Sequence, residues 1–298
     1  MYPMDYEEFR WAMGDRITSA LVTMAFEKQK SLGDDVNRKL MRDFRLYMLV
    51  GGMPQAVNEY LDTNNFGKVD QIKRNIIELY EEDFRKIDSS GRATLLFDAI
   101  PAELNKNASR YQISSVDTHS RADRLMDIIG DMLDSMTVNI AYHADDPSVG
   151  MALNKDPNRY KLFLADTGLF VTLAIKDKDF TENIIYEKLL SDKLSANLGY
   201  VYENVIAQML RTAGNELFYY TMPSETSNHN YEVDFVLSKK NKVCPIEVKS
   251  SGYRTHTSLD KFIEKYPERV LDKYLVYTKD LKKDKDILML PVYMVPFL

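Results

Sequence analysis

Residues 231–249 read Tyr-Glu-Val-Asp-Phe-Val-Leu-Ser-Lys-Lys-Asn-Lys-Val-Cys-Pro-Ile-Glu-Val-Lys. Two apolar segments, 231–238 and 243–249, alternate with polar residues and are joined by a short polar stretch. Alternation with a period of two residues predicts β-strands, and the short joint predicts a hairpin. With the turn centred between Lys240 and Asn241, paired residue numbers sum to 481. This register places Asp234 opposite Glu247.

Charged side chains gather on this hairpin. Glu232 and Asp234 share one face of the first strand, and Glu247 and Lys249 share one face of the second. Two carboxylates opposed across a hairpin repel each other, unless one is protonated or a cation or a lysine lies between them. Mg²⁺ binds through one or two carboxylates, with water and substrate phosphate completing its shell. Lys249 would orient the attacking water and offset charge on the phosphate.

A plainer interpretation of the same residues stays open. Strand edges are often charged, and Asp234 and Lys249 would then form a cross-strand salt bridge that contributes little to stability. Glu203, on the helix that precedes the hairpin, would then be a solvated helix position. The two interpretations predict different responses to divalent ions.

The regions around the hairpin predict an α/β domain over residues 176–298 with a mixed sheet. A helix is expected over 196–213, ended by Gly214. Further strands are expected over 217–221, 274–278 and 288–295, with a helix over 258–265 between the hairpin and the later strands.

The N-terminal two thirds of the chain predict two helical regions. Residues 1–91 have helical periodicity, broken at Gly51-Gly52 and restarted at Pro54, where proline suits a first helical turn. Residues 92–175 predict a short helix over 95–100, a turn or second helix over 102–105, a third helix over 120–135, and strands over 137–142 and 160–164. This order is typical of a winged helix. The third helix is rich in aspartate, which favours a packing role over DNA reading.

Composition narrows the class of protein. The net charge of −6 argues against a protein that coats nucleic acid non-specifically, although the residues from Ser195 onward are nearly balanced in charge. No stretch approaches the length of a membrane span, and no signal peptide is visible. Cys244 is the single cysteine, and the four histidines lack metal-ligand spacing. We therefore expect a cytoplasmic protein of α+β class without membrane or zinc.

Asp234 in one strand, followed by Glu247-x-Lys249 in the next, resembles the motif of the PD-(D/E)XK nuclease superfamily, whose fold is that of restriction endonucleases. Glu203, within Tyr-Val-Tyr-Glu-Asn-Val, matches the additional acidic residue of that superfamily. The resemblance implies that Glu203, Asp234 and Glu247 hold Mg²⁺ or Mn²⁺, and that Asp234, Glu247 and Lys249 are catalytic. Its implied substrate is a phosphodiester, with DNA as the expected partner.

A wider resemblance covers nearly the whole chain. The segments Tyr2-Pro-Met-Asp-Tyr-Glu-Glu-Phe, Tyr47-Met-Leu-Val-Gly-Gly-Met-Pro, Tyr80-Glu-Glu-Asp-Phe-Arg-Lys and Tyr160-Lys-Leu-Phe-Leu-Ala-Asp-Thr-Gly-Leu are similar to a prokaryotic family of AAA-type ATPases. That family joins an ATPase core to a helical lid, a winged helix and a restriction-endonuclease-like domain of unknown function. The resemblance implies these domains at 1–91, 92–175 and 176–298.

The chain departs from that family in one respect, because it lacks Gly-x-x-x-x-Gly-Lys-Ser/Thr. Its only Gly-Lys pair is Gly67-Lys68, without the remainder of the motif. We therefore expect no ATP hydrolysis by this chain alone. ATP would act only through an ATPase core that lies upstream or on a partner ATPase, or that the gene has lost. The rival hypothesis is a non-catalytic module with a degenerate nuclease fold that docks nucleic acid or protein. The sequence carries no signal for oligomeric state.

Overall fold

The computed structural model describes residues 2–106, 110–111, 122–148, 150–179, 184–190, 198–224 and 230–298. The first residues of the helices predicted over 120–135 and 196–213 lie outside this part of the chain. The chain forms two compact units. Unit 1 comprises residues 1–16, 42–140 and 162–194, and unit 2 comprises residues 17–41, 141–161 and 195–298.

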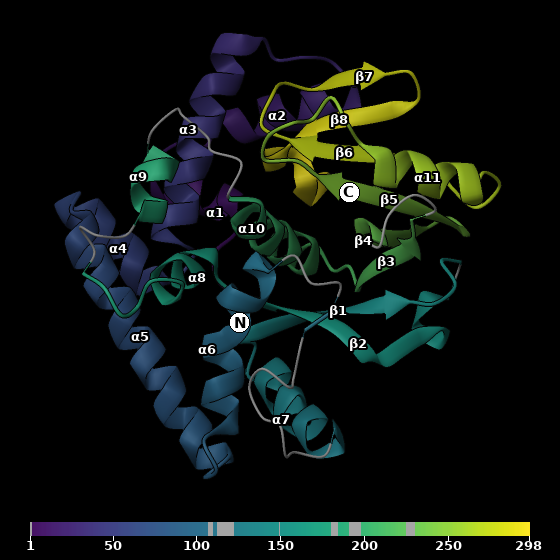
Figure 1. Cartoon of the computed structure of the whole chain (residues 1–298). Coiled ribbons are helices and arrows are strands. Elements are labelled where there is room, and N and C mark those ends of the chain that lie inside the picture. The colour runs from purple at the N-terminus through teal and green to yellow at the C-terminus, as the bar shows by residue number, and fades with distance from the viewer. Residues whose placement is uncertain are drawn as a thin grey trace. The chain divides into compact units, whose positions relative to one another are not determined.

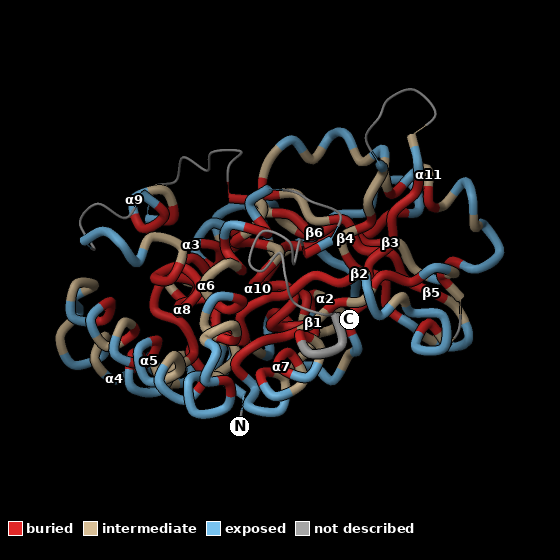
Figure 2. The backbone as a smooth tube through the Cα atoms, turned by 60° about the horizontal axis from the view of Figure 1, so that its bottom comes forward, coloured by how far each residue is buried: buried red, intermediate tan, exposed pale blue. Residues whose placement is uncertain are grey.

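Unit 1 is built mainly from helices (Figure 1). They are α1 (Tyr6–Ala12), the second half of α3 (Asp34–Val50), α4 (Pro54–Thr63), α5 (Phe66–Ile87), α6 (Arg92–Asn105), α7 (Ala122–Asp134), α8 (Thr167–Leu173) and α9 (Ile184–Leu190). In α4 and α5, buried residues recur at helical spacing between exposed ones, as expected of amphipathic helices on a core (Figure 2).

The predicted helix boundaries around Gly51-Gly52 and Pro54 are confirmed. α3 ends at Val50, and Pro54 occupies the first turn of α4. The helix predicted over 95–100 is confirmed, but the break predicted after it is wrong, because α6 is continuous through Pro101 to Asn105. A proline inside a helix removes one hydrogen bond, but α6 buries Leu96, Phe97 and Ile100. Burial of this apolar face offsets the lost bond.

A buried polar network joins the segments of unit 1. The Lys73 ammonium on α5 donates to the carbonyl oxygens of Leu49 (2.7 Å) and Gly168 (3.2 Å) and to the Tyr186 hydroxyl (2.5 Å). Asp166 accepts the backbone N–H of Gly52 (2.6 Å), and its other oxygen accepts an N–H at the start of α8. The network satisfies groups that would otherwise be buried without partners.

Unit 2 is organised around the sheet. Within the described residues the strands form one eight-stranded mixed sheet in the order β2-β1-β3-β4-β5-β6-β8-β7. The strands are β1 (Val138–Ala144), β2 (Lys155–Leu164), β3 (Leu217–Pro223), β4 (Asn230–Lys239), β5 (Lys242–Val248), β6 (Tyr274–Tyr277), β7 (Lys282–Asp284) and β8 (Ile287–Pro291). β7 is exposed along its length, and β2 is mostly exposed over its first half. The α+β class with a mixed sheet is confirmed.

The predicted hairpin is confirmed in type and register. β4 and β5 pair antiparallel, and Phe235 faces Ile246 and Lys239 faces Lys242, so that each pair sums to 481. Lys240 and Asn241 both have positive φ, at 48° and 62°. Positive φ at both central residues is the geometry of a type I′ turn, which matches the twist of the flanking strands.

Two helices pack against strands of this hairpin. α10 (Gly199–Thr212) is almost wholly buried and ends before Gly214, which has a φ of 90° as predicted. α11 (Thr257–Lys265) packs against β4 and β5. The strand predicted over 288–295 is correct only to Pro291, because Val292–Phe297 forms a 3₁₀ helix. Cys244 is buried in β5, as expected of a small core residue.

Part of the N-terminal region belongs to unit 2. Residues 17–41 contain α2 (Thr18–Glu27) and the first half of α3. The rings of Phe26 and Phe297 stack at 5.1 Å, and the Tyr293 hydroxyl donates to Asn37 at 2.9 Å. Sequence order alone did not predict this, because residues that pack together here are about 250 positions apart.

The two compact units divide the chain at different residues from the three predicted domains. The strands predicted as a wing, β1 and β2, are neighbours in the sheet, and β1 pairs with β3 in parallel. In α7 the side chains of Asp127, Asp131 and Asp134 are exposed, which gives this helix an acidic surface. The winged helix itself stays a prediction. Among the described helices, none has both the length and the apolar character needed to cross a membrane.

Candidate functional site

The predicted site lies where the β4–β5 hairpin opens. The regular backbone pairs end at Phe235 and Ile246, one position before Asp234 and Glu247. The next inward-facing N–H of β5, that of Val248, donates instead to Oδ2 of Asp234 at 2.6 Å. A register shift between β3 and β4 occurs at the same place. Irregular pairing of this kind re-aims side chains and is over-represented next to active sites.

Glu247 is buried, and each of its carboxylate oxygens has a partner. Oε1 lies 2.7 Å from Nζ of Lys249, and Oε2 accepts the backbone N–H of Leu259 at 3.0 Å. Leu259 is in the first turn of α11, where the N–H groups have no partner within the helix. Glu247 therefore links β5 to the start of α11, and Lys249, which directly follows β5, forms its ion pair with Glu247.

A buried lysine contacts Glu203, one of the three predicted metal ligands. Lys161 on β2 is only 5% exposed, and its Nζ lies 3.5 Å from Oε2 of Glu203 on α10. The same Nζ donates a hydrogen bond to Oε1 of Glu232 on β4. It also lies 5.5 Å from the centre of the Tyr219 ring. One ammonium group thus bridges carboxylates from a helix and a strand.

These six side chains form the charged cluster: Lys161, Glu203, Glu232, Asp234, Glu247 and Lys249. Burial raises the pKa of Glu203, against the opposing effect of Lys161. Burial and the neighbouring Glu203 raise the pKa of Asp234 well above its usual range. Burial alone would lower the pKa of Lys161, but Glu232 and Glu203 together raise it. Four carboxylates against two lysines leave the cluster with a surplus of negative charge.

The structure therefore brings all four predicted site residues into one region of unit 2. Sequence reasoning missed Lys161 as a member of the site. It placed Glu232 on the same strand as Asp234 but gave it no role. Alternation of charge along β4 was the available signal for Glu232, whereas Lys161 lies 71 positions away from Glu232 and carried none.

A second polar group adjoins the charged cluster, because Thr221 on β3 is paired with Glu232 on β4. His143 lies 2.9 Å through Nδ1 from Asp145 and 3.0 Å through Nε2 from the Thr221 hydroxyl. The Thr221 N–H donates to Nε2, so the proton of a neutral ring is on Nδ1. Burial and Arg159 lower the pKa of His143, which favours this neutral form.

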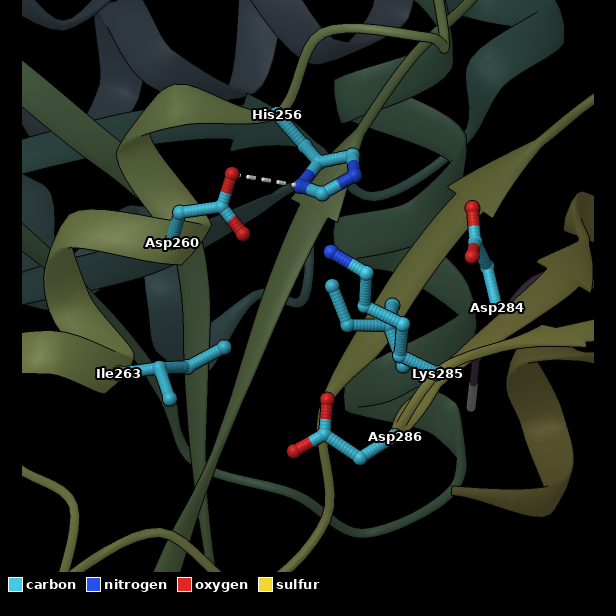
Figure 3. A pocket seen from close by; sticks show the side chains of 7 residues that line it. His256, Asp260, Ile263, Asp284, Lys285 and Asp286 are labelled. Atoms are coloured by element: carbon cyan, nitrogen blue, oxygen red, sulfur yellow. Dashed lines mark ion pairs between the residues drawn. The ribbon is translucent and has the colours of Figure 1, made fainter.

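A pocket of about 240 Å³ lies elsewhere in unit 2, between α11 and the β7–β8 turn (Figure 3). It is lined by His256, Asp260, Ile263, Asp284, Lys285, Asp286 and Ile287. Nδ1 of His256 lies 3.0 Å from Asp260, and Asp286 pairs with Lys273. Asp284 and Lys285 line it as well, and none of the charged cluster does. Side chains of both signs surround the pocket, which favours no particular ligand.

A preformed site for a divalent ion requires several donor side chains around one position. Across the described residues, no group of three or more His, Cys, Asp and Glu side chains is placed to hold a metal ion. Glu203 pairs with Lys161, and Glu247 pairs with Lys249 and an amide. Asp234 uses Oδ2 for the Val248 amide, which leaves Oδ1 as its further acceptor. A preformed three-carboxylate cage is therefore absent from this part of the chain.

We expect Asp234→Asn to raise the stability of the metal-free protein by about 1 kcal/mol, because it removes one of several mutually repelling carboxylates. Asparagine can still accept the Val248 amide. The raised pKa of Asp234 means that the folded state holds more protons than the unfolded state above the ordinary carboxyl pKa. Stability should therefore fall as pH rises from the ordinary carboxyl pKa to the raised pKa of Asp234. Asp234→Asn should make this fall smaller.

Differential scanning calorimetry at several pH values, with and without Mn²⁺, measures both effects. An ion that binds only the folded state at a hundredfold excess over its Kd adds about 2.7 kcal/mol. The expected salt bridge between Asp234 and Lys249 is not the ion pair that Lys249 forms, because Lys249 pairs with Glu247. A purely structural role for Asp234 predicts no response to metal. Glu264→Gln on α11, whose side chain is 70% exposed, is the matched control.

Two parts of the chain match known protein domains. Residues 198–295, which contain α10, the hairpin and α11, match a domain that is associated with the C-terminal regions of AAA-type ATPases. This domain is DUF4143, a domain of unknown function. Residues 41–179 match a second domain of unknown function, DUF8612. No curated protein and no solved structure matches the chain significantly.

Proposed function

We propose that the chain is the C-terminal part of an AAA-type ATPase and that its charged cluster hydrolyses DNA phosphodiesters with Mg²⁺. The observation that carries the proposal is the convergence of Glu203, Asp234, Glu247 and Lys249 at the open end of the hairpin. Asp234 on β4 and Glu247 on β5 come from a strand pair whose register could be predicted from the sequence. The match of residues 198–295 to a domain associated with AAA-type ATPases supports the first half of the proposal.

The donor atoms are of the kind that Mg²⁺ prefers, although the described carboxylates are not gathered around one position. Carboxylate oxygens are the protein ligands that Mg²⁺ prefers, and one or two of them suffice when water and substrate phosphate complete the octahedron. Asp234 has an oxygen to spare, and Glu203 uses only Oε2 for Lys161. These two residues would hold the ion, and Glu247 would join them only by giving up its contact with Lys249 or with the Leu259 amide. The surplus of negative charge in the cluster also favours a divalent cation.

The residues of this chain then have distinct roles. When bound, Mg²⁺ supplies polarisation of the phosphoryl group and a more acidic water. Lys249 is 30% exposed and lies 2.7 Å from Glu247, so that it can reach a water or a phosphate oxygen from a fixed position. Glu247 is held by the first turn of α11, which fixes Lys249 in turn. The proposal places this chemistry in the cytoplasm, with an upstream or partner ATPase core supplying ATP hydrolysis.

A second candidate function is a non-catalytic module that docks nucleic acid or protein. The observation that favours it is that lysines already neutralise several of the carboxylates. Lys161 contacts Glu203 and Glu232, and Lys249 contacts Glu247. In that case the cluster would contribute to structure and the nuclease-like fold would serve as a scaffold.

Cleavage of supercoiled plasmid by the purified chain separates the two functions. We expect nicking or linearisation with Mg²⁺, none with EDTA, and a rate lower by about a hundredfold or more in Asp234→Asn. Glu264→Gln should cleave like the wild type. Equal cleavage by Asp234→Asn would show that the activity comes from elsewhere. No cleavage by the wild type under any divalent ion would favour the docking module.

A further inference from the structure

His143 completes the pairing of β1 with β3 through its side chain. The last backbone pair between these two strands joins His143 to Tyr219. Two residues further along β3, the N–H of Thr221 donates to Nε2 of His143 at 3.2 Å, and the Thr221 hydroxyl lies 3.0 Å from the same nitrogen. His143 is 3% exposed and Thr221 is 9% exposed. A buried backbone N–H requires an acceptor, and here the neutral imidazole is that acceptor.

Charged and titratable groups face the imidazole of His143 from the end of β1, from β2 and from β3. They are Asp145, Asp156, Arg159, Tyr219 and Tyr220. The Arg159 guanidinium donates to the Thr221 hydroxyl at 2.8 Å and lies 4.0 Å from Asp145. Asp145 lies 2.9 Å from Nδ1, but its side chain is 60% exposed, so solvent screens its charge. The neighbouring cation and the burial of the ring therefore favour the neutral form.

We propose that His143 is a pH switch on the charged cluster: the neutral ring holds β1 to β3, and protonation of the ring opens this end of the sheet. A protonated ring carries a hydrogen on Nε2 as well as on Nδ1. The hydrogen on Nε2 would point at the N–H of Thr221, so that two donors face each other and the buried amide loses its acceptor. The switch does not require the cluster to cleave DNA, and only its effect on cleavage rests on the proposed function.

The opening reaches the charged cluster through two cations of β2. Arg159 and Lys161 are two positions apart on this strand and therefore lie on one face of it. Arg159 contacts Thr221 on β3. Lys161 contacts Glu232 on β4, which is the partner of Thr221 across the two strands. A positive imidazole beside Arg159 repels the guanidinium from Thr221, so protonation should loosen the hold of β2 on the cluster and expose Glu232.

The closed and the open state of the sheet bind the proton with different affinity. In the closed state, burial and Arg159 lower the pKa of His143 below its ordinary value of 6.5, against the opposing effects of Asp145 and Asp156. In the open state the ring regains its ordinary pKa and takes up a proton more readily. The closed state is therefore fully favoured above that value. As pH falls below it, the opening constant should rise by up to about tenfold for each pH unit.

Amide hydrogen exchange of Thr221, followed by NMR on the 298-residue chain, measures the opening directly. After correction for the intrinsic pH dependence of exchange, the protection of this amide should fall about tenfold between about pH 7.5 and about pH 5. His143→Gln retains an acceptor oxygen and cannot titrate, so its protection should stay constant over this range. His256→Gln is the matched control, because His256 contacts Asp260 and its loss should leave the response of Thr221 unchanged.

Two further variants keep the test decisive if His143→Gln does not fold. Asp145→Asn removes a carboxylate that favours the protonated ring, so opening should require a lower pH. Arg159→Met removes a cation that opposes it, so opening should occur at a higher pH. At one acidic pH, carbodiimide coupling of glycine ethyl ester should therefore label the Glu232 carboxylate faster in Arg159→Met than in Asp145→Asn.

Protection of the Thr221 amide that stays constant down to about pH 5 overturns the inference. An equal loss of protection in the wild type and in folded His143→Gln also overturns it. Midpoints that shift in the same direction in Asp145→Asn and Arg159→Met would assign the response to another group, with the same consequence. None of these measurements uses plasmid cleavage, so failure of the proposed function is a separate result.

Discussion

Replacing Lys73 with methionine should lower the free energy of unfolding of unit 1 by about 4 kcal/mol. The Lys73 ammonium is fully buried and donates to two backbone carbonyls and the Tyr186 hydroxyl. Methionine fills similar space but donates nothing, so each of these buried acceptors loses a partner. Urea denaturation followed by the fluorescence of Trp11, the single tryptophan, reports on unit 1 because Trp11 lies in it.

The pH dependence of the same protein tests the environment of Lys73. Burial lowers its pKa to about 8, whereas the ordinary value is 10.5. Between these values the unfolded state binds a proton that the folded state has released, so stability should rise with pH from about 8 to about 10. Lys73→Met should remove this rise. Lys68→Met, on the same helix with a 60% exposed side chain, should change stability by less than about 0.5 kcal/mol. A loss of similar size in both variants would contradict the prediction.

Gly168→Ala should cost about 3 kcal/mol, at the upper end of what overpacking does. A Cβ at position 168 would lie 2.5 Å from Cα and 2.6 Å from the backbone N of Gly51, and 2.6 Å from the carbonyl oxygen of Val50. All three are backbone atoms, so no side chain can move aside. The start of α8 and the end of α3 would have to separate, which also breaks the contact of Lys73 with the Gly168 carbonyl.

Gly130→Ala is the matched control, because nothing lies within 4 Å of a Cβ placed there and the residue is inside α7. Glycine lowers helix stability relative to alanine, so this variant should gain about 0.5–1 kcal/mol. The opposite signs of the two substitutions distinguish close backbone packing from a general intolerance of alanine. Equal and small effects at both positions would mean that α3 and α8 are not in contact in solution.

The hairpin was predictable because its information is local. Alternation indicated the faces, and the polar stretch Lys239–Lys242 between the two apolar segments indicated the centre of the turn. A shift of one residue would have moved every side chain to the other face, so the apolar pattern allowed a single register. The helices of the first ninety residues followed from periodicity in the same way.

The remainder of the site depends on long-range contacts that no local pattern encodes. The sequence around Lys161 reads as an ordinary strand. The contact of Lys161 with Glu232 depends on the strand order β2-β1-β3-β4 in the sheet. The contact of Glu247 with Leu259 depends on where α11 begins. The strand predicted over 288–295 was wrong beyond Pro291 because local sequence did not decide it. The apolar run 287–295 is equally compatible with a strand and with a buried 3₁₀ turn.

The two outer strands of the sheet have a consequence for behaviour at high protein concentration. An unpaired strand edge is a template on which another chain can add a strand and begin to aggregate. β7 presents Lys282, Lys283 and Asp284, all exposed, and β2 begins with a mostly exposed stretch that contains Lys155 and Pro157. Charges repel a second copy, and proline has no N–H to offer it. Self-association of this protein should therefore not proceed by strand addition at either edge, and amyloid-like fibres should not grow from the native state.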